Sequence, residues 1–158
     1  MSAAPLVIKR APTLCLDFDG VLHSYTSGWE GANVVSDPPV PGAIPFLLSA
    51  VEHFEVNIFS SRSNQDGGVA AMREWLYRHI AAHLIEVQHV GVLEALDLAH
   101  DLALGGRSRF PCLYFPSVKP PALVAIDDRA ITFTGEWPSI EALLAFQPWN
   151  VPAAKTAE

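Results

Sequence analysis

Two pairs of acidic residues stand at the ends of short apolar runs in this sequence. Asp17 and Asp19 close one run, and Asp127 and Asp128 close another. Neighbouring carboxylates repel one another unless a cation offsets their charge. Carboxylate oxygens are also the ligands that Mg²⁺ and Ca²⁺ prefer. The acidic pairs therefore predict a site that holds a divalent cation.

Each acidic pair also has a simpler interpretation. Asp-x-Asp-Gly, present at 17–20, occurs in ordinary turns and in calcium-binding loops. The calcium-loop interpretation fails because suitable ligands are missing at the fifth, ninth and twelfth positions of such a loop. Asp127 and Asp128 also fit a solvated turn with Arg129 as their partner. We favour the cation site because only 17% of the residues are charged, so clustered acids need a reason.

A third polar cluster follows the apolar run at 55–59 and consists of Ser60, Ser61 and Arg62. The Ser60 hydroxyl could donate to a phosphoryl oxygen there, although Ser60 alone also fits an ordinary cap or turn serine. Strands that alternate with helices indicate an α/β fold with a mainly parallel sheet. Ligands bind outside the carboxyl ends of such strands, so we expect the three polar clusters to meet at one edge.

The spacing of apolar residues and the positions of Gly and Pro predict the elements. Strands are expected at 13–18, 55–59 and 123–126, with a short edge strand or extended segment at 112–115. Helices are expected at 43–53, 69–84, 92–104 and 139–146, the last with Ser139 as its N-cap. We predict an N-terminal extension at 1–12, one domain at 13–147 with a flap at 20–42, and a flexible tail at 148–158.

Composition limits the class of protein. A chain of 158 residues favours one domain. The formal net charge of -7, without a basic run, argues against strong non-specific binding to nucleic acid or to a membrane. The two cysteines are too few for a disulfide framework. With no signal-peptide pattern and no long apolar stretch, we expect a cytoplasmic protein.

Four motifs in one order resemble the haloacid dehalogenase (HAD) superfamily of phosphohydrolases. They are Asp-x-Asp-Gly-Val at 17–21, strand-Ser-x-Arg ending at 62, Lys119 and Ile-Asp-Asp at 126–128. The resemblance covers about 14–133 and is more specific than any single motif. It implies a Rossmann-like three-layer sandwich. The short intervals where this family carries its caps imply a capless or minimal-cap member.

The resemblance also implies roles for single residues. Asp17 matches the nucleophile that forms an aspartyl-phosphate, and Asp19 matches the general acid/base. Ser60 matches the hydroxyl that orients the phosphoryl group. Asp128, with Asp127 beside it, matches the acidic cluster that binds Mg²⁺ together with the Asp17 carboxylate and the Asp19 carbonyl. The implied activity is that of a Mg²⁺-dependent phosphomonoester hydrolase.

Lys119 matches the cation of this family. Only seven residues separate it from Asp127, so a fully extended segment would put the two on the order of 25 Å apart. A turn at Pro120-Pro121 would bring Lys119 back to the site. Arg62 and Arg129 are the alternative cations.

The expected substrate is a phosphorylated molecule. Ser61 and Arg62 are expected to contact it, and in the flap Tyr25 and Trp29 could stack on a base or sugar or merely pin the flap. An open site would admit a nucleotide, a nucleic-acid end or a phosphoprotein, and a homodimer could supply a cover. The rival hypothesis is a non-catalytic phospho-ligand or partner-binding module on the same scaffold.

Overall fold

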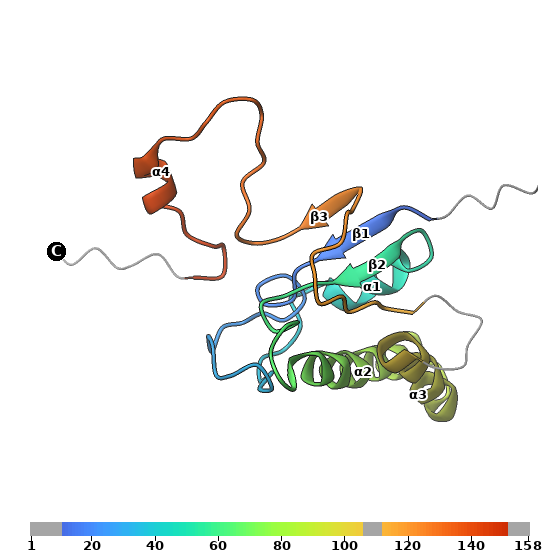
Figure 1. Cartoon of the computed structure of the whole chain (residues 1–158). Helices are drawn as coiled ribbons and strands as arrows, with labels where there is room; N and C mark the ends of the chain where they lie inside the picture. The colour runs from blue at the N-terminus through green and yellow to red at the C-terminus, as the bar shows by residue number, and fades with distance from the viewer. Residues whose placement is uncertain (1–10, 106–111, 152–158) are drawn as a thin grey trace, which may run out of the picture.

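A computed structural model describes residues 11–105 and 112–151, which have an α/β fold (Figure 1). Three parallel strands form an open sheet in the order β2-β1-β3, with β1 at Thr13–Leu16, β2 at Glu55–Ile58 and β3 at Val124–Ile126. The predicted α/β class and parallel sheet are confirmed. Residues 1–10 of the predicted N-terminal extension lie outside the described residues.

The helices follow the predicted order. They are α1 at Ala43–Ala50, α2 at Gly68–Glu86, α3 at Val92–His100 and α4 at Ile140–Leu144. The single helix expected at 92–104 is α3 followed by a π-helical turn, η1, at Asp101–Gly105. Ser139 caps α4 as expected, because its Oγ accepts the Ala142 N–H at 3.1 Å.

The strand expected at 112–115 is reduced to one parallel bridge between Tyr114 and Asn57. Tyr114 bonds with the free edge of β2, donating to the Val56 carbonyl at 3.0 Å. Pro116 has no N–H with which to continue such a ladder. The segment is therefore extended at the edge of the sheet without becoming a strand.

The core lies between the strands, α1 and α2. Trp75 of α2 is 1% exposed, and its ring meets the Phe18 ring edge-on at a centroid distance of 5.2 Å. The indole N–H of Trp75 donates to the Asp37 carbonyl at 2.9 Å. The predicted flap at 20–42 contains no helix or strand, and this bond ties it to α2.

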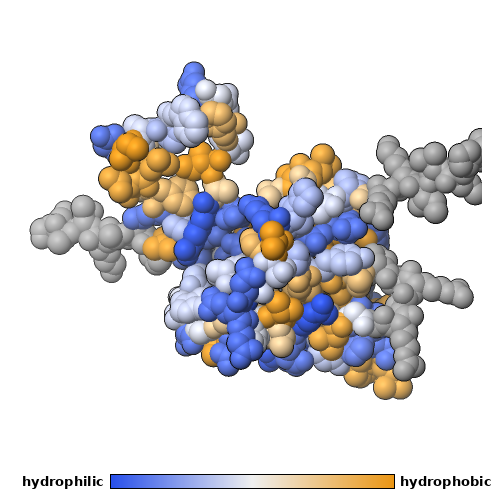
Figure 2. All heavy atoms as spheres, in the orientation of Figure 1, coloured by the Kyte–Doolittle hydropathy of each residue, from blue (hydrophilic) through white to orange (hydrophobic). Residues whose placement is uncertain are grey.

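β3 and the chain after it are less buried than the rest. Parallel strands are usually covered on both faces, yet every residue of β3 is exposed. Residues 127–151 leave the end of β3 and carry α4 away from the other helices (Figure 1). Figure 2 shows apolar side chains on the surface of this part of the molecule. Its exposed large apolar residues include Ile131, Phe133, Trp137, Ile140 and Leu144.

Within the two described ranges, no helix has both the length and the apolar character that crossing a membrane requires.

Candidate functional site

The central strand positions the first acidic residue. The N–H of Asp17 donates to the Ile126 carbonyl at 2.9 Å, and the N–H of Phe59 donates to the Leu16 carbonyl at 3.0 Å. Both ladders therefore continue to the carboxyl ends of the strands. Asp127 is the next residue after β3, and Ser60 follows Phe59 after β2, so both come to the edge of the sheet where Asp17 lies.

A cavity of about 260 Å³ opens at the same edge. Its polar wall consists of Asp17, Asp19, Tyr25, Ser60, Ser61, Lys119, Asp127 and Arg129, and the other lining residues are Cys15, Phe59, Ala125 and Ile126. The predicted meeting of three polar clusters is therefore observed. Of the predicted site residues, only Trp29, Arg62 and Asp128 lie outside this wall.

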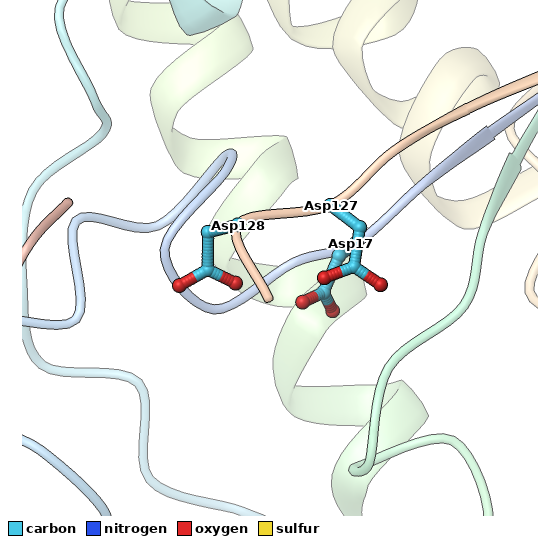
Figure 3. A group of neighbouring side chains, drawn as sticks. All are labelled: Asp17, Asp127 and Asp128. Atoms are coloured by element: carbon cyan, nitrogen blue, oxygen red, sulfur yellow. The ribbon is translucent and has the colours of Figure 1, made fainter. Parts of the chain in front are cut away.

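Three carboxylates gather beside the cavity (Figure 3). One oxygen each from Asp17, Asp127 and Asp128 can be chosen so that all lie within 4.8 Å of one another. The Asp128 side chain is 1% exposed, and neither of its oxygens has a hydrogen-bond partner among the described residues. Its charged neighbour is the Arg129 guanidinium, whose Nε lies 3.8 Å from Oδ2 on a largely exposed side chain. A buried carboxylate without hydrogen-bond donors is costly, so this arrangement also fits a bound cation.

Burial and mutual repulsion raise the pKa of two acids of this cluster, Asp17 and Asp128. Burial raises the pKa of Asp17 from 3.8 to about 7, and the Asp127, Asp128 and Asp19 charges add to the rise. The Phe18 N–H, 2.7 Å from Asp17 Oδ1, opposes it. Burial also raises the pKa of Asp128, although the nearby Arg129 lowers it. A divalent cation would reverse both shifts because it stabilises the ionised carboxylates.

The pKa of Asp19 is shifted in the opposite direction to those of Asp17 and Asp128. Burial alone would raise its pKa, but hydrogen bonds from His23 and Arg62 outweigh burial and lower it. His23 Nδ1 lies 2.9 Å from one Asp19 oxygen, and Arg62 Nε lies 2.7 Å from the other. Asp19 is therefore held as a carboxylate with a donor on each oxygen.

Lys119 reaches the cavity because the chain does not run straight from it to β3. Leu123 forms a bend, and its N–H donates to the Thr13 carbonyl at 2.9 Å, so the chain turns there before it enters β3. The distant position that a fully extended segment would impose is not adopted. Arg129, considered from the sequence only as an alternative cation, lines the same cavity.

Trp29 and Arg62 lie away from the cavity wall. Arg62 is 0% exposed, and the Trp29 ring covers it with its centroid 4.8 Å from the Arg62 Cζ atom. Trp29 therefore contacts Arg62 and not the cavity, whereas Tyr25, the other aromatic residue predicted to contact the substrate, lies in the cavity wall.

The chain returns to the site near its C-terminal end. The Trp149 indole N–H donates to the Gly20 carbonyl at 2.8 Å, and Asn150 Nδ2 donates to the Ser24 carbonyl at 3.4 Å. Trp149 also lines a second cavity of about 280 Å³ together with Asp128. Residues 149–150 of the predicted tail thus contact the flap, while 152–158 lie outside the described residues. The sequence contains no pattern that predicts this return.

Comparison with known proteins gives no relative, since no family model, curated protein or solved structure matches this chain.

Proposed function

We propose that this protein is a Mg²⁺-dependent phosphomonoester hydrolase that acts through an aspartyl-phosphate on Asp17. In this proposal the α/β domain is a Rossmann-like three-layer sandwich of the HAD type, with the flap in place of a large cap. The observation that carries the proposal is the gathering of Asp17, Asp127, Ser60 and Lys119 around one cavity at the carboxyl ends of parallel strands.

The donor set supports Mg²⁺ as the cofactor. The carboxylates of Asp17, Asp127 and Asp128, with the carbonyl of Asp19, would supply the oxygen ligands that this ion prefers. Asp128 supports the fit because its side chain is buried and its oxygens accept no hydrogen bond from the described residues. When bound, Mg²⁺ would neutralise charge on both the acids and the phosphoryl oxygens. The remaining chemistry belongs to the side chains.

The side chains would divide the reaction into two steps. An Asp17 oxygen would attack phosphorus and the bond from phosphorus to the leaving oxygen would break. Asp19 would give that oxygen a proton, which requires that Asp19 first takes up a proton and releases one of its two hydrogen-bond donors. Water then attacks the phosphoryl group and gives a proton to Asp19, which releases inorganic phosphate and restores the Asp17 carboxylate. Ser60 and Lys119 would orient the phosphoryl group and offset its charge through both steps.

The size and lining of the cavity indicate which substrates would fit. A volume of about 260 Å³ leaves room for a phosphoryl group and part of its leaving group. Tyr25 and Arg129 on the wall would contact that leaving group. A nucleotide, a nucleic-acid end or a phosphoprotein would each project the rest of its structure out of such a site.

The direct test is hydrolysis of p-nitrophenyl phosphate with and without Mg²⁺. We expect activity that needs the ion and falls by several orders of magnitude in Asp17→Asn, which keeps the size of the side chain but loses the nucleophile. Asp97→Asn, on the exposed surface of α3, is the matched control and should retain full activity. Equal rates in the wild type and Asp17→Asn would refute the proposed nucleophile.

A second candidate is a non-catalytic module that binds a phosphorylated ligand or partner. The hydrogen bonds to Asp19 favour this second candidate. Each Asp19 oxygen already accepts a hydrogen bond, so neither is free to exchange a proton with a leaving group. This candidate predicts saturable binding of phosphate with Mg²⁺, measured by calorimetry, without turnover of any phosphomonoester.

A further inference from the structure

Arg62 is a buried cation that joins three parts of the molecule. It follows β2 by a few residues and is 0% exposed. Its Nε donates to Asp19 at 2.7 Å. Its Nη1 lies 2.8, 2.9 and 2.7 Å from the carbonyl oxygens of Gly31, Ala32 and Val34 in the flap, so its two N–H groups are shared among these three acceptors. A buried charge is tolerated only when it is paired and hydrogen-bonded. Arg62 meets both conditions, through its ion pair with Asp19 and its bonds to the flap carbonyls.

His23 completes this arrangement from within the flap. Its Nε2 accepts the Asp37 N–H at 3.0 Å, so this nitrogen carries no proton. The proton of the neutral ring is then on Nδ1, which donates to Asp19 at 2.9 Å. His23 is 1% exposed and packs against the rings of both Phe18 and Trp75. It therefore cannot turn away from Asp19 without disturbing the core.

Asp37 anchors the far end of the flap. Its carboxylate accepts hydrogen bonds from the N–H and the hydroxyl of Ser27 at 2.8 and 2.7 Å. Its carbonyl accepts the Trp75 indole N–H from α2. The flap is thus bonded to the end of β2 through Arg62 and to α2 through Trp75.

We propose that Arg62 is a positioning residue that fixes the flap as a preformed wall of the site and, with His23, sets the position of the Asp19 carboxylate. The part of this inference that concerns Asp19 rests on the proposed function. The part that concerns the flap does not. In this arrangement substrates are selected by a wall of fixed shape, without closure of a lid.

Arg62→Lys separates positioning from folding. Lysine keeps the positive charge for Asp19, but its single ammonium group cannot bond both to Asp19, as Nε does, and to the flap carbonyls, as Nη1 does. Arg73→Lys is the matched control. Arg73 also donates to a backbone carbonyl, that of Ala103, and stacks on an aromatic ring, that of Phe115, but it lies outside the site.

The first measurement is limited proteolysis with chymotrypsin, which cleaves after aromatic residues such as Tyr25 and Trp29 in the flap. We expect Arg62→Lys to be cut in the flap at least tenfold faster than the wild type, while Arg73→Lys is not. Unchanged cleavage of the flap in a folded Arg62→Lys protein would overturn the fixed wall. This measurement needs no enzymatic activity.

The second measurement compares two phosphomonoesters. Nitrophenolate leaves without a proton, whereas the alkoxide of glycerol phosphate needs one from Asp19. We expect Arg62→Lys to lower kcat/KM for glycerol phosphate at least tenfold more than for p-nitrophenyl phosphate. In a protein that already carries Asp19→Asn, Arg62→Lys should cause no further loss of kcat/KM. An equal loss on both substrates would mean a purely structural role for Arg62. If the wild type has no activity, the proposed function is refuted instead. The proteolysis experiment would still show whether Arg62 fixes the flap.

Discussion

The carboxylate of Asp128 occupies the space that a side chain on Gly20 would need. A Cβ atom on Gly20 would lie 2.7 Å from Asp128 Cγ and closer still to Oδ2. Gly20 also has a φ of +86°, a conformation that other residues adopt at a cost. The glycine of the Asp-x-Asp-Gly motif thus has a second role beyond the turn, because it lets a carboxylate from the end of β3 pack against the loop that follows β1.

Gly20→Ala is expected to displace Asp128 and to weaken Mg²⁺ binding at least tenfold. The measurement is the rise in melting temperature on addition of Mg²⁺. Gly28→Ala is the matched control, since Gly28 has a similar φ of +76° but a new Cβ there would have no atom of the described residues within 4 Å. Both variants should lose about 1–2 kcal/mol from backbone strain. Only Gly20→Ala should lose its response to Mg²⁺, and equal responses in the two variants would contradict this role.

The raised pKa of Asp17 predicts a pH-dependent competition between protons and Mg²⁺. Below about pH 7 the metal-free protein holds a proton on Asp17 that the ion must displace. The apparent affinity for Mg²⁺ should therefore rise by up to about tenfold per pH unit until pH 7 and then level off. Calorimetry across this range measures it. Asp17→Asn should bind more weakly and with a flatter pH profile, and an unchanged profile in that variant would assign the proton to another group.

The same shift predicts how stability depends on pH without metal. The folded-state pKa of Asp17 is about 7 and the unfolded value is about 3.9, so the folded state binds this proton more tightly. The contribution of this Asp17 proton to the free energy of unfolding is fully present below about pH 4 and is lost as the pH rises through 7. Chemical denaturation should show a smaller decline over this range in Asp17→Asn than in the wild type. Mg²⁺ should restore stability mainly above pH 7.

Lys119 is expected to be the cation of the site. Lys119→Gln should lower kcat/KM for p-nitrophenyl phosphate about 100-fold, the scale of losing one charged or hydrogen-bonding group from a transition state. Arg129→Gln should cost less than tenfold, because the Arg129 side chain is 57% exposed and lies 3.8 Å from Asp128. The reverse order would assign the cation role to Arg129.

The sequence was sufficient for features that follow from local pattern. Apolar runs and turn residues predicted the strands and helices, and the geometry of parallel strands predicted that Asp17, Ser60 and Asp127 meet at one edge. It was insufficient where the outcome depends on how a loop folds back. The contact of Arg62 with the flap depends on the path of 20–42, which contains no regular element. The exposure of β3 likewise depends on the path of residues 127–151, which the pattern of hydrophobic residues alone does not specify.

Trp149 should report on cation binding through its fluorescence. Its indole N–H is bonded to the Gly20 carbonyl, and it shares a cavity with Asp128. A charge change at Asp128 should therefore alter its emission when Mg²⁺ binds. We expect Trp149→Phe to lose most of the Mg²⁺-dependent change, whereas Trp137→Phe should retain it, since Trp137 is 86% exposed and lies outside both cavities. A response that survives in Trp149→Phe would mean that the ion binds away from Asp128, because no other tryptophan of the described residues lines either cavity.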